Sequence, residues 1–404
     1  MKKIYVENFG PVKKAELELR NINLLIGEQS IGKSTLAKLI TILTDYLSLS
    51  SIIIMGDAYW QMQLKEYGID IYSDDKYKII FDLEENGKEF HLEITPNKLI
   101  SYLISNGKRI TNKGKMGVEL FSLKPLYHQD FILKKINEYN AKKDKNELNH
   151  NDVTELFHNS LYVPAERIIY PVVTKLLPAL TLAKSTVPKN LLRFMVDLEN
   201  AKATYPKFDM PLLNISYQKE NADDYFIIHE NNKKFLLSAA SSGVQSTLPL
   251  LLVLQYAIEH REYTSFVIEE PECNLFPAKQ VELLKHIIKL VKNDNRILTI
   301  TTHSPYLLSA LNNYLFAGTL VSKYGDKISE GIGSVLPSEY QLKLNECSVY
   351  SLGEDINGKN LYCKPLIDSR TGMIDYNSLD GISLKMNAEF EQLEKAFIQM
   401  RRKK

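Results

Sequence analysis

The sequence predicts an α/β fold, because short apolar segments alternate with segments of helical periodicity. Residues 22–26, 266–268 and 297–301 are mostly apolar and uncharged, which is typical of strands buried on both faces of a sheet. From about Ser34 through Leu47, and again over residues 248–258 and 281–291, apolar residues recur at helical spacing, which predicts one helix in each segment. This alternation indicates helices that pack on a buried sheet.

Composition and charge exclude several classes of protein. The 404 residues include 50 basic and 49 acidic side chains, and 44% of them are hydrophobic, so a disordered or collagen-like chain is excluded. A formal charge of +1 also argues against a uniformly basic nucleic-acid binder, although the lysines at 142, 143 and 145 leave a local positive groove open. Three cysteines without a C-x-x-C pair predict neither a zinc site nor a disulfide framework.

The apolar stretches of the sequence are shorter than a membrane span. The chain has no uncharged apolar segment of about 18 residues, the length of a membrane span. Glu7 and Pro11 stand where a signal peptide would need an apolar core. We therefore expect a cytoplasmic protein that does not contact a membrane.

Antiparallel strands are predicted in two regions outside the buried sheet. Residues 4–6 and 15–19 read as strands around Gly10-Pro11, and residues 77–83 and 90–94 read as a hairpin with a turn at 85–87. A further hairpin is expected over residues 223–237. The polar run 139–152 is read as an exposed loop or the tip of a helical hairpin, and residues 171–203 look helical.

A glycine-rich loop joins the first buried strand to its helix. It matches G-x-x-x-x-G-K-[ST] and comprises Gly27, Glu28, Gln29, Ser30, Ile31, Gly32, Lys33 and Ser34, followed by Thr35. In such a loop the backbone N–H groups converge on phosphate oxygens at a helix N-terminus, and the lysine neutralises the β- and γ-phosphates. The alternative is an ordinary glycine-rich turn from strand to helix, followed by an exposed lysine.

Two later segments supply groups that act on phosphates. The strand at 266–268 ends in Glu269 and Glu270, and paired carboxylates there can hold magnesium and polarise a water molecule. The next strand ends in Thr302-His303-Ser304-Pro305, where a histidine could reach a γ-phosphate. Taken alone, His303 is equally well read as an ordinary core or surface histidine.

A second candidate anion site lies just before the apolar helix at 248–258. Ser241, Ser242 and Gly243 offer hydroxyl and free N–H groups at a helix start. One triphosphate does not need two such sites in one chain. The segment is therefore read as a cap over a nucleotide bound by another subunit, and the alternative is an ordinary N-capped helix.

The order of these elements resembles the ABC-type ATPases of the RecF, SMC, Rad50 and OLD branch. More narrowly it resembles bacterial stand-alone AAA family ATPases of that branch, many of which belong to anti-phage systems. Three further segments carry the resemblance, namely residues 8–11 (NFGP), 162–167 (YVPAER) and 269–277 (EEPECNLFP). It covers residues 1–50 and roughly 160–310.

The resemblance implies a P-loop NTPase with an ABC-type head, made of a mixed sheet and an antiparallel β subdomain, and an inserted, mostly helical lobe. It implies ATP bound by residues 27–35, with Lys33 also catalytic, and Mg²⁺ bound by Ser34 and Glu269. Gln129 is a candidate further magnesium ligand. It also implies that Glu270 is the catalytic glutamate, that His303 is the switch histidine, and that Ser241, Ser242 and Gly243 contact ATP across a dimer.

The chain departs from the pattern of this branch at three places. Glu269 stands where most ABC proteins have aspartate, and Gln29-Ser30 replace the commoner Asn-Gly of the loop. Val244, directly after Ser241, Ser242 and Gly243, interrupts the usual signature sequence. Weak recognition across the dimer and slow or partner-stimulated turnover are therefore expected.

The expected organisation divides the chain at the edges of the resemblance. Residues 1–50 and 161–310 form the two halves of the ATPase core, residues 51–160 hold β-hairpins and a helical insertion, and residues 311–404 form a C-terminal α/β extension. The resemblance implies a homodimer that encloses ATP and a separate effector protein in an anti-phage system. Binding of nucleic acid stays open.

The leading hypothesis is a dimeric switch that is driven by ATP binding and hydrolysis, and other functions compete with it. An OLD-like nuclease would need a carboxylate-rich site with a D-x-D pattern, but Asp368, Asp375 and Asp380 are separated in the tail. A structural clamp or scaffold that binds ATP without hydrolysing it would not need Glu270. A DNA-binding repair clamp similar to SMC or RecF proteins is a further alternative.

Two features are left with alternatives. Arg167 is read as structural, paired with Glu166 or another carboxylate, rather than as a contact to nucleotide or to a partner lobe. The apolar spacing within residues 379–398 predicts an amphipathic helix, read as packing on the core rather than docking a partner.

Overall fold

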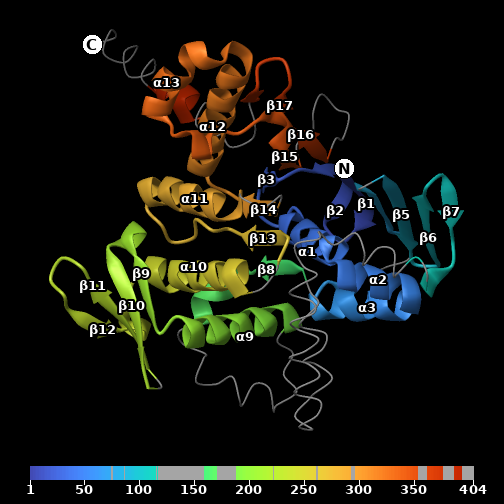
Figure 1. Cartoon of the computed structure of the whole chain (residues 1–404), viewed down its shortest axis with the longest axis horizontal. Coiled ribbons are helices and arrows are strands. Elements are labelled where there is room, and N and C mark those ends of the chain that lie inside the picture. The colour runs from blue at the N-terminus through green and yellow to red at the C-terminus, as the bar shows by residue number, and fades with distance from the viewer. Residues whose placement is uncertain are drawn as a thin grey trace.

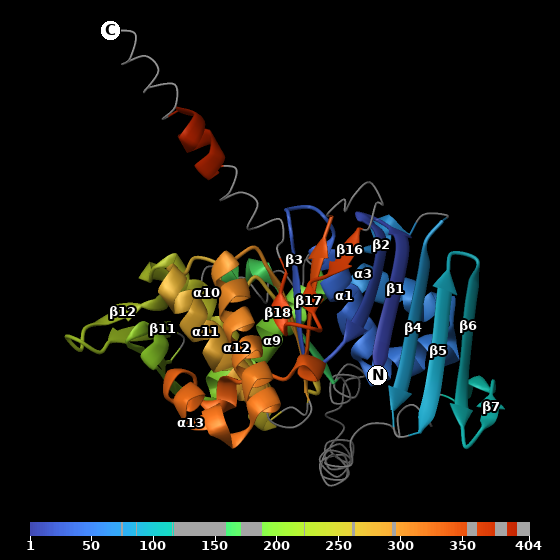
Figure 2. The ribbon, with the colours of Figure 1, turned by 90° about the horizontal axis from the view of Figure 1, so that it is seen from above.

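The computed structural model describes residues 1–73, 76–85, 87–114, 116, 159–170, 188–221, 223–260, 263–292, 296–353, 362–375 and 386–393. Within these ranges a central sheet lies between two helical layers, and an antiparallel sheet flanks each layer (Figures 1 and 2). Gln129 and the polar run 139–152 lie outside the described residues, as does most of the segment predicted to be an inserted helical lobe.

The central sheet has the strand order β16-β15-β3-β14-β13-β8. Its strands are β3 (Ile22–Gly27), β8 (Ser160–Val163), β13 (Ser265–Glu269), β14 (Ile297–Thr302), β15 (Cys347–Leu352) and β16 (Cys363–Pro365). β8, β13, β14, β3 and β15 run parallel, and β16 pairs with β15 in the antiparallel sense. The predicted mixed sheet and α/β class are thus confirmed.

Residues far apart in the sequence complete this sheet. β15 pairs with β3 in register Ser348↔Asn23, although 325 residues separate the two, and the hydroxyl of Ser348 donates to Asn23 Oδ1. Two strands of the sheet therefore come from the segment 311–404, beyond the expected end of the core at residue 310. No helical or turn signal near β15 indicates this pairing, because it is made through the backbone of a distant strand.

The antiparallel sheet on one side has the order β2-β1-β4-β5-β6-β7. Its strands are β1 (Lys2–Phe9), β2 (Val12–Leu19), β4 (Lys78–Glu85), β5 (Lys88–Thr95), β6 (Lys98–Ser105) and β7 (Lys108–Ile110). The predicted hairpins and their turns are confirmed, and alternate residues of these strands face the core.

Three helices pack between this sheet and the central one, and beside them β2 contacts β15 and β16 directly. The helices are α1 (Lys33–Thr44), α2 (Tyr46–Met55) and α3 (Asp57–Glu66). The expectation of one helix from Ser34 through Leu47 is wrong, because Asp45 adopts an extended backbone and its carboxylate accepts hydrogen bonds from the N–H groups of Leu47 and Ser48. The chain bends by 79° between α1 and α2.

The opposite face of the central sheet is covered by a second helical layer. It contains α9 (Lys189–Thr204), α10 (Ser242–His260), α11 (Pro277–Val291), α12 (Pro305–Tyr324) and α13 (Asp326–Val335). Beyond it lies the antiparallel sheet β12-β11-β10-β9, built from β9 (Lys207–Met210), β10 (Ile215–Glu220), β11 (Asp223–Ile228) and β12 (Lys234–Leu236). β17 (Ile367–Asp368) and β18 (Met373–Ile374) form a short separate pair.

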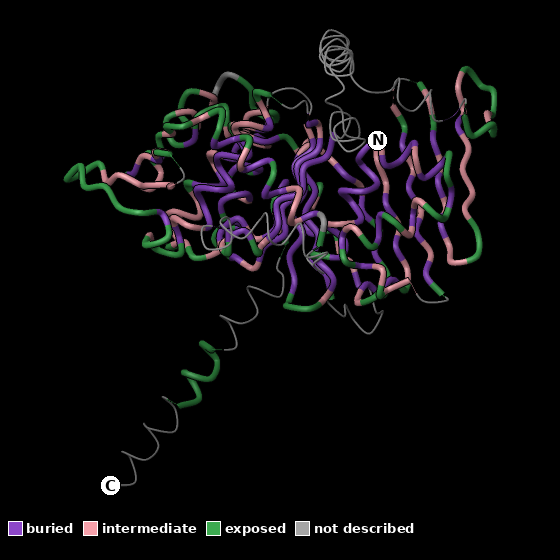
Figure 3. Tube along the Cα trace, turned by 90° about the horizontal axis from the view of Figure 1, so that it is seen from below, coloured by how far each residue is buried: buried purple, intermediate pink, exposed green. Residues whose placement is uncertain are grey.

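The central sheet is buried on both faces, as its sequence predicts (Figure 3). Phe266 and Ile268 face the core shared with α9–α12, whereas Val267, between them, faces the core shared with α1–α3. Within the described ranges, no single helix combines the length and apolar composition needed to cross a membrane.

The C-terminal helix is placed differently from the expectation. Residues 386–393 are helical and all exposed, and Figure 2 shows them apart from the core. Packing on the core is therefore wrong for these residues, and the rest of the predicted helix lies outside the described residues.

Gly318 lets α12 approach the backbone that precedes β15. A methyl group at this position would overlap the backbone of Leu342. We expect Gly318→Ala to lower the free energy of unfolding by about 1–3 kcal/mol, because neither helix nor backbone can yield without repacking. Gly331 and Gly333, in α13, have open space around them, so alanine there should stabilise by about 0.4–1 kcal/mol. Urea denaturation of the variants measures these opposite changes in the free energy of unfolding. Equal changes at Gly318 and at the two α13 glycines would contradict the close approach of α12 to Leu342.

Candidate active site

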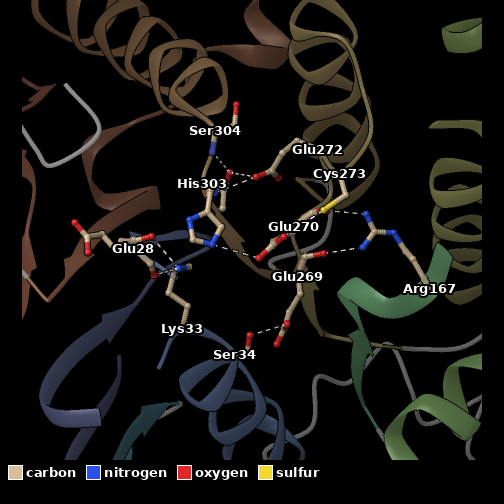
Figure 4. A network of polar contacts seen from close by, with 12 residues as sticks. Glu28, Lys33, Ser34, Arg167, Glu269, Glu270, Glu272, Cys273, His303 and Ser304 are labelled. Atoms are coloured by element: carbon tan, nitrogen blue, oxygen red, sulfur yellow. Dashed lines mark hydrogen bonds and ion pairs between the residues drawn. The ribbon is translucent and has the colours of Figure 1, made fainter. Parts of the chain in front are cut away.

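The carboxyl ends of β3, β13 and β14 border an open cleft of about 500 Å³. Eight of the residues singled out from the sequence line it, namely Gln29, Ser30, Gly32, Lys33, Ser34, Thr35, Glu270 and His303. Figure 4 shows four of them, Lys33, Ser34, Glu270 and His303, which come from three separate parts of the chain. The structure thus brings the glycine-rich loop, the paired glutamates and the histidine together.

Glycines shape the loop between β3 and α1. Gly27 has a φ of 146° and Gly32 a φ of 101°, both in the region that favours glycine. A Cβ at Gly32 would lie 2.8 Å from Val12 Cγ2, so a side chain there would also collide with the turn after β1. These two positions leave the N-terminus of α1 open toward the cleft, the arrangement that suits an anion.

Lys33 turns its amine back toward the loop. Its Nζ donates to the carbonyl oxygens of Gly27 at 2.8 Å and Glu28 at 2.6 Å. Burial lowers the pKa of Lys33 to about 8, against the opposing effect of nearby carboxylates, chiefly Glu270. The loop therefore holds a cation whose charge costs desolvation energy and which an anionic ligand would stabilise.

Ser34 and Glu269 form a pair of oxygen donors at the start of α1. The Ser34 hydroxyl donates to Glu269 Oε2 at 2.9 Å, and the Tyr162 hydroxyl donates to Oε1 at 2.7 Å. Burial raises the pKa of Glu269, and these two hydrogen bonds oppose the rise. A hydroxyl and a carboxylate are ligands that Mg²⁺ prefers, so the residues fit the ion that the family resemblance implies. Tyr162 was noted only as part of a motif, and its role in this pair was missed.

The surroundings of Glu270 lower its pKa, whereas those of Glu269 raise it. Its Oε1 lies 3.4 Å from His303 Nε2, and its Oε2 accepts a hydrogen bond from Cys273 Sγ at 3.2 Å. The contact with His303 is the largest of the effects that lower the pKa of Glu270 to about 2. Glu270 also has a φ of 42°, which is strained for a non-glycine residue. It is therefore an ionised carboxylate held toward the cleft.

A third glutamate in the same loop, Glu272, was not singled out from the sequence. Its Oε1 accepts hydrogen bonds from the hydroxyl of Thr302 and, at 3.0 Å, from the N–H of His303. Glu272 is buried, and burial raises its pKa. It fixes the end of β14 to the loop after β13, and so sets the position of His303 relative to Glu270.

Arg167 is fully buried beneath the paired glutamates. Among the described residues it donates to main-chain carbonyl oxygens, those of Pro164 at 3.0 Å, Ser246 at 3.0 Å, Glu269 at 2.7 Å and Glu270 at 2.7 Å. These contacts support a structural role for Arg167. Within the described part of the chain, the guanidinium meets main-chain carbonyl groups and not the expected carboxylate. Arg167 ties the first turn of α10 to the backbone that carries both glutamates.

The candidate signature segment lies away from the cleft of its own chain. Ser241 and Ser242 are exposed, and neither they nor Gly243 line that cleft. Gln245 shapes the segment by donating to the carbonyl oxygens of Ser238 at 3.1 Å and Ala240 at 3.0 Å. A Cβ at Gly243 would lie 2.9 Å from Asn274 O, so the glycine lets α10 start against the loop that carries the glutamates.

A known protein family matches the part of the chain that forms the cleft. The protein-family model described as AAA ATPase domain matches residues 1–167 and 181–308. No curated protein matches the chain.

Among solved structures, the SMC head domain from Thermotoga maritima is 13% identical, covers 76% of this chain and 90% of that one, and has a TM-score of 0.38. A SmcHead bound to the C-winged helix domain of ScpA is 13% identical, covers 76% and 90%, and has a TM-score of 0.40. A Smc head domain with an extended coiled coil, bound to the C-terminal domain of ScpA derived from Pyrococcus furiosus, is 13% identical, covers 77% and 92%, and has a TM-score of 0.37.

Proposed function

The chain belongs to the AAA ATPase domain family, and we propose that it binds ATP with Mg²⁺ and hydrolyses it to switch a pair of subunits between a closed and an open state. One observation carries the proposal. A loop cation, Lys33, and an ionised carboxylate, Glu270, line the same cleft, although their strands are far apart in the sequence. Such a pair can hold a triphosphate and activate water beside it.

Each residue of the cleft has a distinct task in this proposal. The loop N–H groups and Lys33 bind the phosphates, and Ser34 with Glu269 would hold Mg²⁺, which supplies charge neutralisation of the phosphates when bound. Glu270 accepts a proton from the attacking water, and His303 hydrogen-bonds that glutamate and reaches toward the γ-phosphate. The buried position of Glu269 and the ionised state of Glu270 support this division of roles.

The proposal places two ATP molecules between two copies of the chain. Support comes from Ser241 and Ser242, which are exposed and offer hydroxyl groups at the start of α10 but lie outside the cleft of their own chain. In a symmetric pair each copy can present this surface to the cleft of the other. Opening and closing of the pair would then follow ATP binding and hydrolysis.

A mixing experiment tests the shared site. Lys33→Ala removes the phosphate-binding cation but leaves the signature intact, whereas Ser242→Arg blocks the exposed signature and leaves the cleft intact. Each variant alone should release no phosphate from ATP. An equal mixture should recover up to about a quarter of the wild-type rate, because half of randomly paired dimers carry one intact site of two. No recovery, from variants that still exchange subunits, would contradict sites shared between copies.

We further propose that the ATPase serves an anti-phage system and acts on a separate effector protein. This part is supported only by the resemblance of the motifs to ATPases of such systems. Expression of the gene with its neighbours should protect a bacterial host from phage, measured as plating efficiency, and Lys33→Ala should abolish the protection. Unchanged plating with the wild-type genes would contradict this role without affecting the ATPase proposal.

A further inference from the structure

Tyr72 lines the cleft but has no task in handling phosphates. It ends the 3₁₀ helix Asp70–Tyr72, between α3 and β4, and so comes from the segment inserted between the two halves of the ATPase core. The residue is half-buried. Nothing in its sequence context singled it out, because Asp70 to Tyr72 match no binding motif.

The tyrosine ring is held in place by the turn after β1. Gly10, with a φ of 54°, lies directly against the ring, and any side chain at Gly10 would overlap it. The ring of Phe9 meets it edge-on, with centroids 6.2 Å apart and planes at 78°. Tyr72 is therefore a fixed aromatic wall of the cleft rather than a free surface side chain.

This wall begins next to the phosphate loop. Pro11, which also lines the cleft, lies between the two, because a Cβ at Gly32 would be 3.4 Å from Pro11 Cγ. Gly32, Pro11 and Tyr72 thus follow one another along one side of the cleft. The polar side chains of Lys33, Glu270 and His303 line it as well, so the cleft has one polar region, with Lys33 and Glu270 as charged groups, and one flat apolar region.

A nucleoside triphosphate has the same two regions. Its phosphates carry the charge, and its base is a flat ring attached through the ribose. We propose that Tyr72 is the base-binding residue of the site, on which the nucleobase stacks beside Pro11. This inference rests on the proposed ATP site and adds a role for the inserted segment. Because every base has a π-face, stacking distinguishes nucleotides from base-free phosphates and does not by itself distinguish adenine from guanine.

The test compares ATP with inorganic triphosphate, which has the phosphates but no base. Both are titrated calorimetrically in the presence of Mg²⁺ against Tyr72→Leu and Tyr72→Phe, in a Glu270→Gln background that prevents turnover. Leucine keeps apolar bulk against Gly10 without an aromatic face. We expect Tyr72→Leu to weaken ATP binding roughly 5- to 150-fold and to leave inorganic triphosphate unchanged, while Tyr72→Phe binds both normally.

The controls separate this inference from the ATP site itself. Tyr324→Leu, at an exposed tyrosine that ends α12 outside the cleft, should change neither affinity. Lys33→Ala should weaken both ligands. Unchanged ATP affinity in Tyr72→Leu would overturn the inference, and so would an equal loss for both ligands, which would make Tyr72 a support of the loop. If the parent protein bound neither ligand, the proposed ATP site would itself be wrong.

Discussion

Glu270→Gln is expected to lower the rate of ATP hydrolysis by about 10²- to 10⁴-fold while ATP still binds. The contact with His303 lowers the pKa of Glu270 to about 2, so the carboxylate is ionised at neutral pH and can accept a proton from water. Glutamine has nearly the same shape but cannot accept that proton. Phosphate release and the amount of ATP retained on the purified protein measure the two halves of the prediction.

A matched substitution elsewhere controls for the loss of one negative charge. Glu282, exposed on α11 and paired with Lys279 at 2.7 Å, should tolerate glutamine without a change in rate. A trapped ATP-bound dimer in Glu270→Gln would support the switch. Equal, background-level phosphate release from the wild type and Glu270→Gln would instead favour a clamp that binds ATP without hydrolysing it.

Three glutamates within four positions of the chain have different environments. Burial raises the pKa of Glu269 and of Glu272, whereas hydrogen bonds from His303 and Cys273 lower that of Glu270. The sequence EEPE does not encode these differences, because each depends on which distant residue the carboxylate meets. Glu269 meets Ser34 and Tyr162, and Glu272 meets the end of β14.

The features predicted correctly from sequence are those encoded by neighbouring residues. The loop at 27–34 requires glycine at positions of positive φ, and its motif and flanking strand are contiguous. The hairpin of β4 and β5 is likewise signalled by alternation and by Gly87 in its turn. In both cases a few adjacent residues determine the local backbone.

The features that were missed depend on contacts between distant segments. β15 pairs with β3, Tyr162 meets Glu269, and Tyr72 lies against Gly10, each across a long interval of sequence. The end of α1 at Asp45 is encoded locally, because Asp45 caps α2, but the apolar spacing continues across it and so predicted a single helix. Tyr162, Arg167 and Glu272 all belong to segments that carried the family resemblance, so the resemblance marked their importance without indicating their partners.

Arg167→Met is expected to lower the free energy of unfolding by about 3–5 kcal/mol, comparable to removing one partner of a buried charged pair. Methionine can fill the space but leaves the carbonyl oxygens of Ser246, Glu269 and Glu270 without this donor. Burial lowers the pKa of Arg167, yet a guanidinium stays protonated in proteins, so all of its N–H groups remain donors. Thermal and urea unfolding of the purified variants measure the loss.

Arg109→Met is the matched control, because Arg109 is exposed on β7 and lies over the ring of Tyr102 at 4.0 Å, so its loss should cost far less. Arg167→Lys keeps the charge but cannot reach four carbonyl groups at once, and should fold with intermediate stability. At a temperature where Arg167→Lys is folded, its ATP hydrolysis should still be reduced, because the backbone of Glu270 has lost a fixed contact. Full activity there would show that Arg167 only stabilises the fold. A reduced rate with normal ATP binding would instead mean that one buried side chain links α10, which carries the proposed signature, to Glu270, the proposed catalytic residue.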